Sequence, residues 1–125
     1  MALPFGTYND DVIKVLKEVG VLYCRTCEHT YNFEMPNDLP LLHPTCHFRY
    51  KDLDKLTDEF LNTQTDGDML FYIWGHSYEL VTEDDWQNFE LMLKIFLTIR
   101  EKFMFYGKKN WGKRGKIIKL FCLWN

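Results

Sequence analysis

Hydrophobic positions along the chain follow two periods, and their order predicts an α/β protein. Apolar side chains recur every three or four residues over Asp10 to Val19, Asp52 to Asn62 and Glu83 to Lys102, which is typical of amphipathic helices. Short, uninterrupted apolar runs at Val21 to Tyr23 and Met69 to Trp74 are typical of strands covered on both faces. The alternation of helices and strands indicates parallel strands joined by helical crossovers.

Residues that favour helix ends support these boundaries. Asn9 is a good N-cap for the first helix, and Gly20 is a good terminator. Thr82 and Asp85 resemble a capping box, with Asp in place of the usual Glu, at the start of the third helix.

The segment Thr26 to Tyr50 has no persistent period and contains three prolines, so it is predicted to be a long loop. His29, His43 and His47 lie in this loop after the first expected strand, and His76 follows the second. In parallel α/β folds, binding groups collect at the carboxyl ends of the strands. His76 is therefore the leading candidate for a functional residue.

Composition limits the class of protein. The chain has 125 residues, of which 46% are hydrophobic and 17% aromatic, enough for one domain with a real core. Its longest apolar run, Met69 to Trp74, is far shorter than the roughly 20 residues of a membrane-spanning helix. No positive charge precedes Lys14 and no long apolar segment follows it, so no secretion signal is expected. These features predict a cytoplasmic protein with no membrane partner.

Charge divides the chain into two parts. Residues 1–101 contain all 18 acidic residues, whereas residues 102–125 contain 7 of the 15 Lys and Arg residues. We therefore expect a body over residues 1–102 and a basic tail over residues 103–125. The tail is predicted to be dispensable for the body, with docking of residues 117–124 on a sheet edge as the alternative. Aromatic residues within the tail could stack on nucleic acid, but the acidic body would repel phosphates, so no nucleic-acid partner is expected.

One spacing matches a zinc finger. Cys24 and Cys27 are followed by His43 and His47, with a gap that falls within the finger range. A finger needs both histidines on one helix, and the prolines in and before this stretch disfavour a helix there. We therefore expect no structural zinc and reduced cysteines.

Four segments together resemble the polysaccharide deacetylases, which are NodB-like carbohydrate esterases. The similar segments are Pro4–Asp10 (PFGTYND), Gly20–Thr26 (GVLYCRT), Leu42–His47 (LHPTCH) and Leu70–Glu79 (LFYIWGHSYE). The resemblance runs from about residue 3 to residue 100, and it covers the carboxyl-terminal half of the family domain.

The resemblance implies part of a deformed (β/α) barrel that removes acetyl groups from sugar polymers. His76 would protonate the leaving group. Pro4, Phe5 and Tyr8 would line the substrate groove, His43 would border it, and Trp74 would replace the apolar residue that usually lies beside the acid. The expected partner is an acetylated oligosaccharide or polysaccharide.

In this family a divalent metal, often zinc, activates the attacking water. Its ligand motifs belong to the amino-terminal half, so no metal ligands and no cofactor are assigned within this chain. Residue Gly75 replaces the leucine that usually precedes the acid. The resemblance therefore predicts a truncated form that is inactive alone, whose missing half a separate chain could supply. The alternative is a non-catalytic carbohydrate-binding or scaffold remnant.

Overall fold

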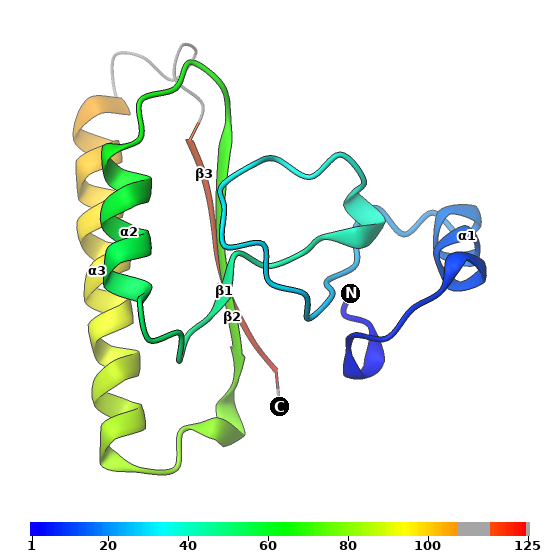
Figure 1. Ribbon diagram of the computed structural model, residues 1–125, viewed down its shortest axis with the longest axis horizontal. Helices are drawn as coiled ribbons and strands as arrows, with labels where there is room; N and C mark the ends of the chain where they lie inside the picture. The colour runs from blue at the N-terminus through cyan, green and yellow to red at the C-terminus, as the bar shows by residue number, and fades with distance from the viewer. Residues whose placement is uncertain (108–115, 125) are drawn as a thin grey trace.

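The computed structural model describes residues 1–107 and 116–124, with side chains described through Ile99. Within these residues there are three α-helices, three strands and three single-turn helices. In chain order these are the turn Pro4–Gly6, α1 (Asp10–Glu18), the turn Leu39–Leu41, β1 (Cys46–His47), α2 (Leu53–Asn62), β2 (Met69–His76), the turn Ser77–Glu79, α3 (Glu83–Gly107) and β3 (Lys116–Trp124) (Figure 1).

The sheet is parallel, and its strands neighbour one another in chain order. The strand order is β1-β2-β3, with β2 in the centre. Two isolated parallel bridges extend this arrangement beyond β1, since Arg25 bridges both Ala2 and Leu42. The expected α/β class with parallel strands and helical crossovers is therefore confirmed.

Helices α2 and α3 lie together on one side of the sheet, whereas α1 and most of the loop before β1 lie on the other (Figure 1). The main hydrophobic core forms between these two helices and β2. Its fully buried members are Cys46, Phe60, Phe71, Ile73, Met92 and Ile99.

Alternation along β2 determines which side chains can form a site. Phe71 and Ile73 face the helices, and Tyr72 packs with Leu42 on the opposite face. Since successive residues of a strand point to opposite faces, Trp74 and His76 lie on the face away from the helices.

The bounds of the three helices agree with the prediction to within one residue, except at the end of α3. Helix α1 begins at Asp10 as expected, and the Asn9 side chain accepts a hydrogen bond from the backbone N–H of Val12 at 2.9 Å. Helix α3 begins at Glu83 as expected but continues to Gly107, beyond the predicted end.

The strand expected at Val21 to Tyr23 is wrong. Leu22 and Tyr23 are exposed, and the buried residues come directly afterwards, from Cys24 to Thr26. Gly20 has a positive φ of 76°, which turns the chain sharply after α1. The apolar run Val21 to Tyr23 therefore lies at the surface. The parallel bridges are formed by Arg25, which follows this run.

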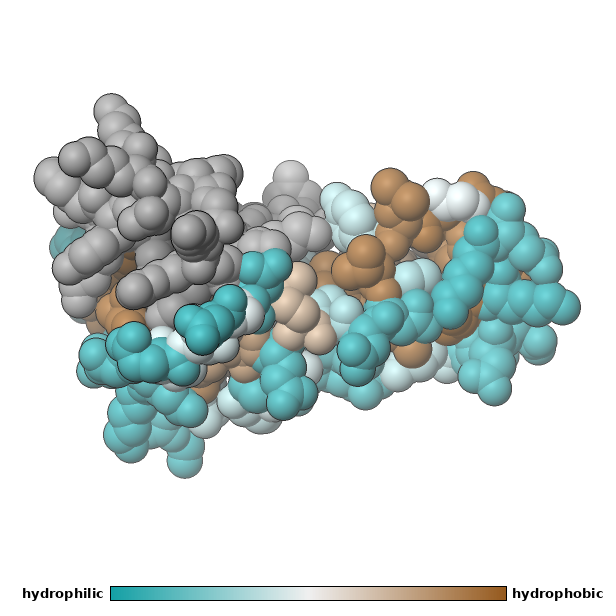
Figure 2. Space-filling model, turned by 90° about the horizontal axis from the view of Figure 1, so that it is seen from above, coloured by the Kyte–Doolittle hydropathy of each residue, from teal (hydrophilic) through white to brown (hydrophobic). Residues whose placement is uncertain are grey.

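Helix α1 buries only part of its apolar stripe. Ile13 and Leu16 pack with Leu3 and Cys24 in a small second cluster, whereas Val15 is 53% exposed. Figure 2 shows hydrophobic residues at the surface in the half of the molecule where α1 lies.

The basic tail contains the strand that completes the sheet. β3 pairs with β2 over nearly its whole length, from Met69 opposite Lys116 to His76 opposite Trp124. The structure thus has the docked alternative and not a passive tail. Residues 108–115 and Asn125 of the tail lie outside the described residues. Among the described helices, none has both the length and the apolar character needed to cross a bilayer.

Candidate functional site

His76 lies where β2 ends and the Ser77–Glu79 turn begins. This turn brings the Glu79 carboxylate back to the strand, where its Oε2 accepts a hydrogen bond from the His76 backbone N–H at 2.7 Å. The Nδ1 atom of His76 lies 3.3 Å from the same oxygen and is buried. Since Nδ1 is buried against Glu79, any contact between this ring and a ligand must use Nε2.

His47, at the end of the neighbouring strand β1, joins the same carboxylate. Its Nε2 is 3.0 Å from Glu79 Oε2, and its Nδ1 accepts a hydrogen bond from the backbone N–H of Arg49 at 3.2 Å. A nitrogen that accepts a hydrogen bond carries no proton, so the proton of neutral His47 is on Nε2 and is donated to Glu79. His47, His76 and Glu79 form what we term the Glu79 cluster.

Burial and hydrogen bonding set the charges in this cluster. Burial lowers the pKa of His47, and the nearby Glu79 only partly opposes this effect, so the imidazole is neutral at neutral pH. Burial alone would raise the pKa of Glu79, but the His76 backbone N–H and His47 outweigh it and lower that pKa. The cluster therefore holds one carboxylate anion between two imidazoles.

Arg49 and Asp85 attach the start of α3 to this site. The Arg49 guanidinium contacts the Glu79 carbonyl oxygen and lies 2.5 Å from Asp85 Oδ1. Asp85 Oδ2 accepts from the Thr82 backbone N–H, and Thr82 Oγ1 accepts from the Asp85 backbone N–H, so the expected capping box is confirmed. Hydrogen bonds from Thr82 are the main reason that the pKa of Asp85 is lowered to about 2.

Trp74 is the buried centre around which the site assembles. Its side chain is only 8% exposed, so it backs the site and offers no open stacking surface. Its ring lies edge-on to His47 and to His76, with centroid distances of 4.9 and 5.3 Å. Its Nε1–H donates to His29 Nε2 at 2.9 Å, and the guanidinium carbon of Arg25 lies 4.5 Å from the ring centroid.

The exposed aromatic residue beside His76 is Tyr78. Its ring stacks on the imidazole at a centroid distance of 4.8 Å and an interplanar angle of 27°, and the residue is 66% exposed. Tyr78 thus offers a flat aromatic surface next to the His76 ring, which the sequence predicts to be functional.

Two of the residues predicted to bind substrate meet at a different carboxylate. The Tyr8 hydroxyl donates to Glu28 Oε1 at 2.7 Å, and His43 Nδ1 lies 4.0 Å from Glu28 Oε2. His43 Nδ1 is also 2.7 Å from the Thr26 hydroxyl. The structure therefore brings Tyr8 and His43 together, but no described contact joins them to His76.

Pro4 and Phe5 form the single turn before α1. Both are exposed, and Phe5 is 97% exposed with a positive φ of 55°. A bulky residue in the left-handed region is unusual, and here it directs an aromatic side chain into solvent.

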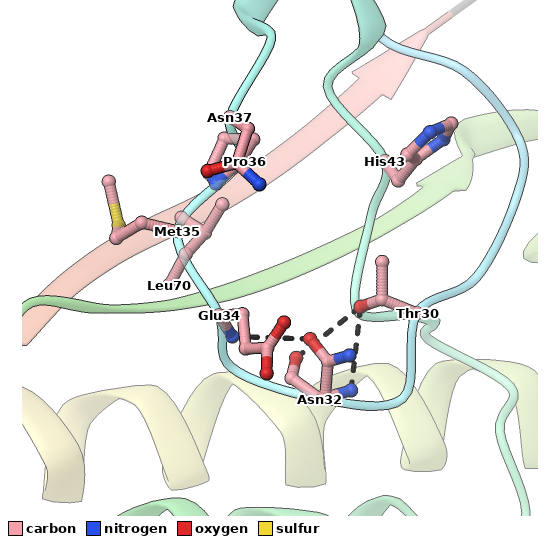
Figure 3. Close-up of a pocket in the computed structure, with 8 residues that line it drawn as sticks. All are labelled: Thr30, Asn32, Glu34, Met35, Pro36, Asn37, His43 and Leu70. Carbon is pink, nitrogen blue, oxygen red and sulfur yellow. Dashed lines mark hydrogen bonds between the residues drawn. The ribbon is translucent and has the colours of Figure 1, made fainter.

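His43 also lines a cavity of about 150 Å³ that is distinct from the Glu79 cluster. Hydrogen bonds among Thr30, Asn32 and Glu34 form one wall, and Leu70 forms part of another (Figure 3). Leu70 is near the start of β2, whereas His76 is at its end, so this cavity lies away from the candidate site.

The metal that the resemblance implies does not fit the His43-x3-His47 pair, because the two imidazoles bind Thr26 and Glu79 separately. The four residues of the finger spacing likewise form no common ligand group in the described part of the chain. There, the ligand-forming group is the Glu79 cluster, whose donor atoms lie within 4.8 Å of one another. Its donor types suit zinc, but a metal on His47 Nε2 would displace the proton that the Arg49 hydrogen bond fixes there.

Sequence reasoning located His76 but missed its partners. Glu79 follows His76 by three residues. At this spacing a single turn can bring the carboxylate back to the end of the strand, so the sequence contains a signal for this contact. The roles of His29, His47 and Arg25 depend on contacts with Trp74 across the fold, for which the sequence gives no local signal.

Comparison of the chain with protein-family models, with curated proteins and with solved structures gives no match.

Proposed function

We propose that this chain is part of a hydrolase of the polysaccharide-deacetylase type, with His76 as the proton donor to the departing sugar amine or alcohol. The fold would be a partial, deformed (β/α) barrel. The order of the parallel segments supports this, because each one lies beside the next one in the chain. The order is Ala2, Arg25, Leu42 together with β1, then β2 and β3. His76 would then lie at the carboxyl end of a strand, where barrel enzymes place their reactive groups.

The observation that carries the proposal is the arrangement of His76 on Glu79. Nδ1 lies 3.3 Å from the Glu79 carboxylate and is buried, so Nε2 is the ring nitrogen that remains to face a ligand. Nε2–H can then be given to a leaving nitrogen or oxygen on the side of the sheet away from the helices. General acid catalysis of this kind contributes roughly 10² to 10⁴ in rate.

A nucleophile is the part of the reaction that these residues do not supply. His47 donates its proton to Glu79 and is held by Arg49, so it is not a free base for a water molecule. We therefore predict no release of acetate from acetylated chito-oligosaccharides by this chain alone. A separate chain that carries the metal-binding half would complete the reaction.

An added nucleophile tests the donor role directly. Hydroxylamine can attack the acetyl carbonyl of an N-acetylated chito-oligosaccharide, which gives acetohydroxamate and a free sugar amine. The leaving amine needs a proton, so the protein should accelerate this reaction over buffer, by up to about 10²-fold.

His76→Gln should remove the acceleration, and the control change Lys55→Gln, at an exposed position of α2, should preserve it. Acetohydroxamate is measured by its iron complex. Absence of acceleration, or equal rates for the wild-type and His76→Gln chains, would refute proton donation by His76.

The exposed Tyr78 favours one alternative, a non-catalytic carbohydrate-binding module. In that case Tyr78→Ala would weaken binding of the oligosaccharide, as measured by calorimetry, and the hydroxylamine reaction would show no dependence on His76.

A further inference from the structure

Arg25 is a buried cation without a counter-charge in the part of the chain whose side chains are described. The residue is 5% exposed. Its Nη1 donates to the Thr26 carbonyl oxygen at 3.2 Å and lies 3.6 Å from the Cys27 sulfur. Its Nε is buried and makes no hydrogen bond to the described residues.

Such an arrangement is costly for the protein alone. A guanidinium has five N–H donors, and removing its charge from water is unfavourable unless an anion or several acceptors compensate. The face of Trp74, 4.5 Å from the guanidinium carbon, provides a cation–π attraction but no hydrogen-bond acceptor. The Nε donor of Arg25 therefore lacks a hydrogen-bond acceptor among the described residues.

The surroundings of Trp74 favour an anionic ligand. Besides Arg25, its ring contacts His29, His47 and His76. The carboxylate described next to these groups is that of Glu79, and it is already shared by His47 and His76. Arg25 is therefore the permanent positive charge beside this ring, and the Glu79 carboxylate does not neutralise it because that carboxylate lies against His47 and His76.

We propose that Arg25 is the anchor of a binding site for a small carboxylate, which pairs with the guanidinium donors that the fold leaves unused. Guanidinium and carboxylate match in geometry and can form two parallel hydrogen bonds. The identification of this carboxylate as acetate, the product of deacetylation, rests on the function proposed above.

The probe is sodium acetate, compared with sodium chloride at equal ionic strength. A ligand that binds the folded state raises the unfolding temperature in proportion to the logarithm of its concentration above Kd. Acetate should therefore stabilise the wild-type chain in this way, and it should shift the ¹H–¹⁵N signal of the Arg25 side-chain Nε–H with saturation. Arg25→Lys, which lacks Nε, identifies that signal.

Arg25→Met should lose the acetate effect and keep its stability in chloride, because an apolar side chain of similar length removes an uncompensated charge. The control Arg49→Met, which changes an arginine already paired with Asp85, should keep the effect. If Arg25→Met does not fold, the proposal is tested by the saturable shift of the Arg25 Nε–H signal in the wild-type chain.

The proposal is overturned if acetate and chloride act alike, if the Arg25 signal does not move, or if Arg25→Met still responds to acetate. These outcomes are independent of the hydroxylamine reaction, so either proposal can fail without the other.

Discussion

Gly75 shows how the absence of one side chain shapes the site. A Cβ at this position would overlap the ring of Phe48, and it would lie 3.4 Å from His47 Nε2. The glycine thus admits the Phe48 ring between β2 and the helices. Where the family resemblance predicts leucine, this fold fills the space from the neighbouring strand end.

Gly75→Ala should therefore destabilise the protein, by about 1–3 kcal/mol, because Phe48 must move to admit the methyl group. Urea unfolding measures the loss. The second change Phe48→Leu should recover part of it in the double variant, because contacting residues are energetically coupled. Additive effects of the two changes would contradict the proposed overlap.

His29 makes the stability depend on pH. Burial lowers its pKa below the ordinary 6.5, and proximity to His47 adds to the effect. His29 Nε2 accepts the Trp74 N–H, so protonation would break that hydrogen bond. The unfolded chain therefore binds more protons than the folded one just below pH 6.5.

We predict that stability is constant above that pH and falls as the pH decreases through the lowered pKa of His29. Urea midpoints measured between about pH 7.5 and 5.5 should decrease. The decrease should be shallower in His29→Gln, whose side-chain oxygen can still accept from Trp74. His47, whose pKa is also lowered, should maintain part of the slope. An equal slope in both proteins would assign the effect elsewhere.

The sequence could identify His76 because its position depends on one strand, which periodicity predicts. It could not identify Arg25 or His29, because their roles arise from contacts with Trp74, which is 45 residues away from His29 in the chain. Local sequence patterns predict where a strand ends. They do not predict which side chains from distant loops contact the end of that strand.

At the scale of elements, β3 is the clearest departure from expectation. Glycines and a sudden excess of positive charge made the tail resemble an appendage, yet its apolar run pairs with β2. An unpaired edge of a parallel strand exposes a row of N–H and C=O groups that a neighbour can satisfy.

Truncation after Met104 should therefore lower the unfolding midpoint and promote aggregation, because β2 would lose the partner that satisfies this edge. Lys119→Pro tests the same pairing without deletion, since Lys119 lies opposite Tyr72 and proline cannot donate to the ladder. Lys119→Thr is the matched control and should have little effect. A truncated chain as stable as the full one would mean that the pairing contributes nothing.

The run Val21 to Tyr23 is predicted to be a strand, and this prediction is wrong because of a turn next to it. Its apolar side chains satisfy the pattern, but the Gly20 turn directs the chain so that Leu22 is 77% exposed. Long amphipathic helices such as α2 and α3 are predicted better, because many positions contribute to their period.

At the scale of the whole molecule, the described hydrophobic residues form one large core and two smaller clusters. The large core joins α2, α3 and β2, whereas one of the smaller clusters joins α1 to Leu3 and Cys24. A helix held by few buried contacts opens locally at a lower free energy than a central strand.

Amide hydrogen exchange should therefore show weaker protection in α1 than in β2. Leu16→Ala, a buried position, should reduce protection of α1 by about 2–4 kcal/mol, or until its amides exchange freely, and leave β2 largely protected. Val15→Ala, on the exposed side of the same helix, should change it little. A uniform loss of protection across α1 and β2 would show that the two cores unfold together.

The chain-order pairing of the parallel segments has a consequence for synthesis on the ribosome. Each pairing closes only the loop between consecutive segments, so the sheet can be built as the chain emerges, from Ala2 towards β2. The pairing of β2 with β3 comes later, because the long helix α3 separates these two strands in the chain. Until Trp124 has left the exit tunnel, one edge of β2 is open, and that edge can pair with another chain.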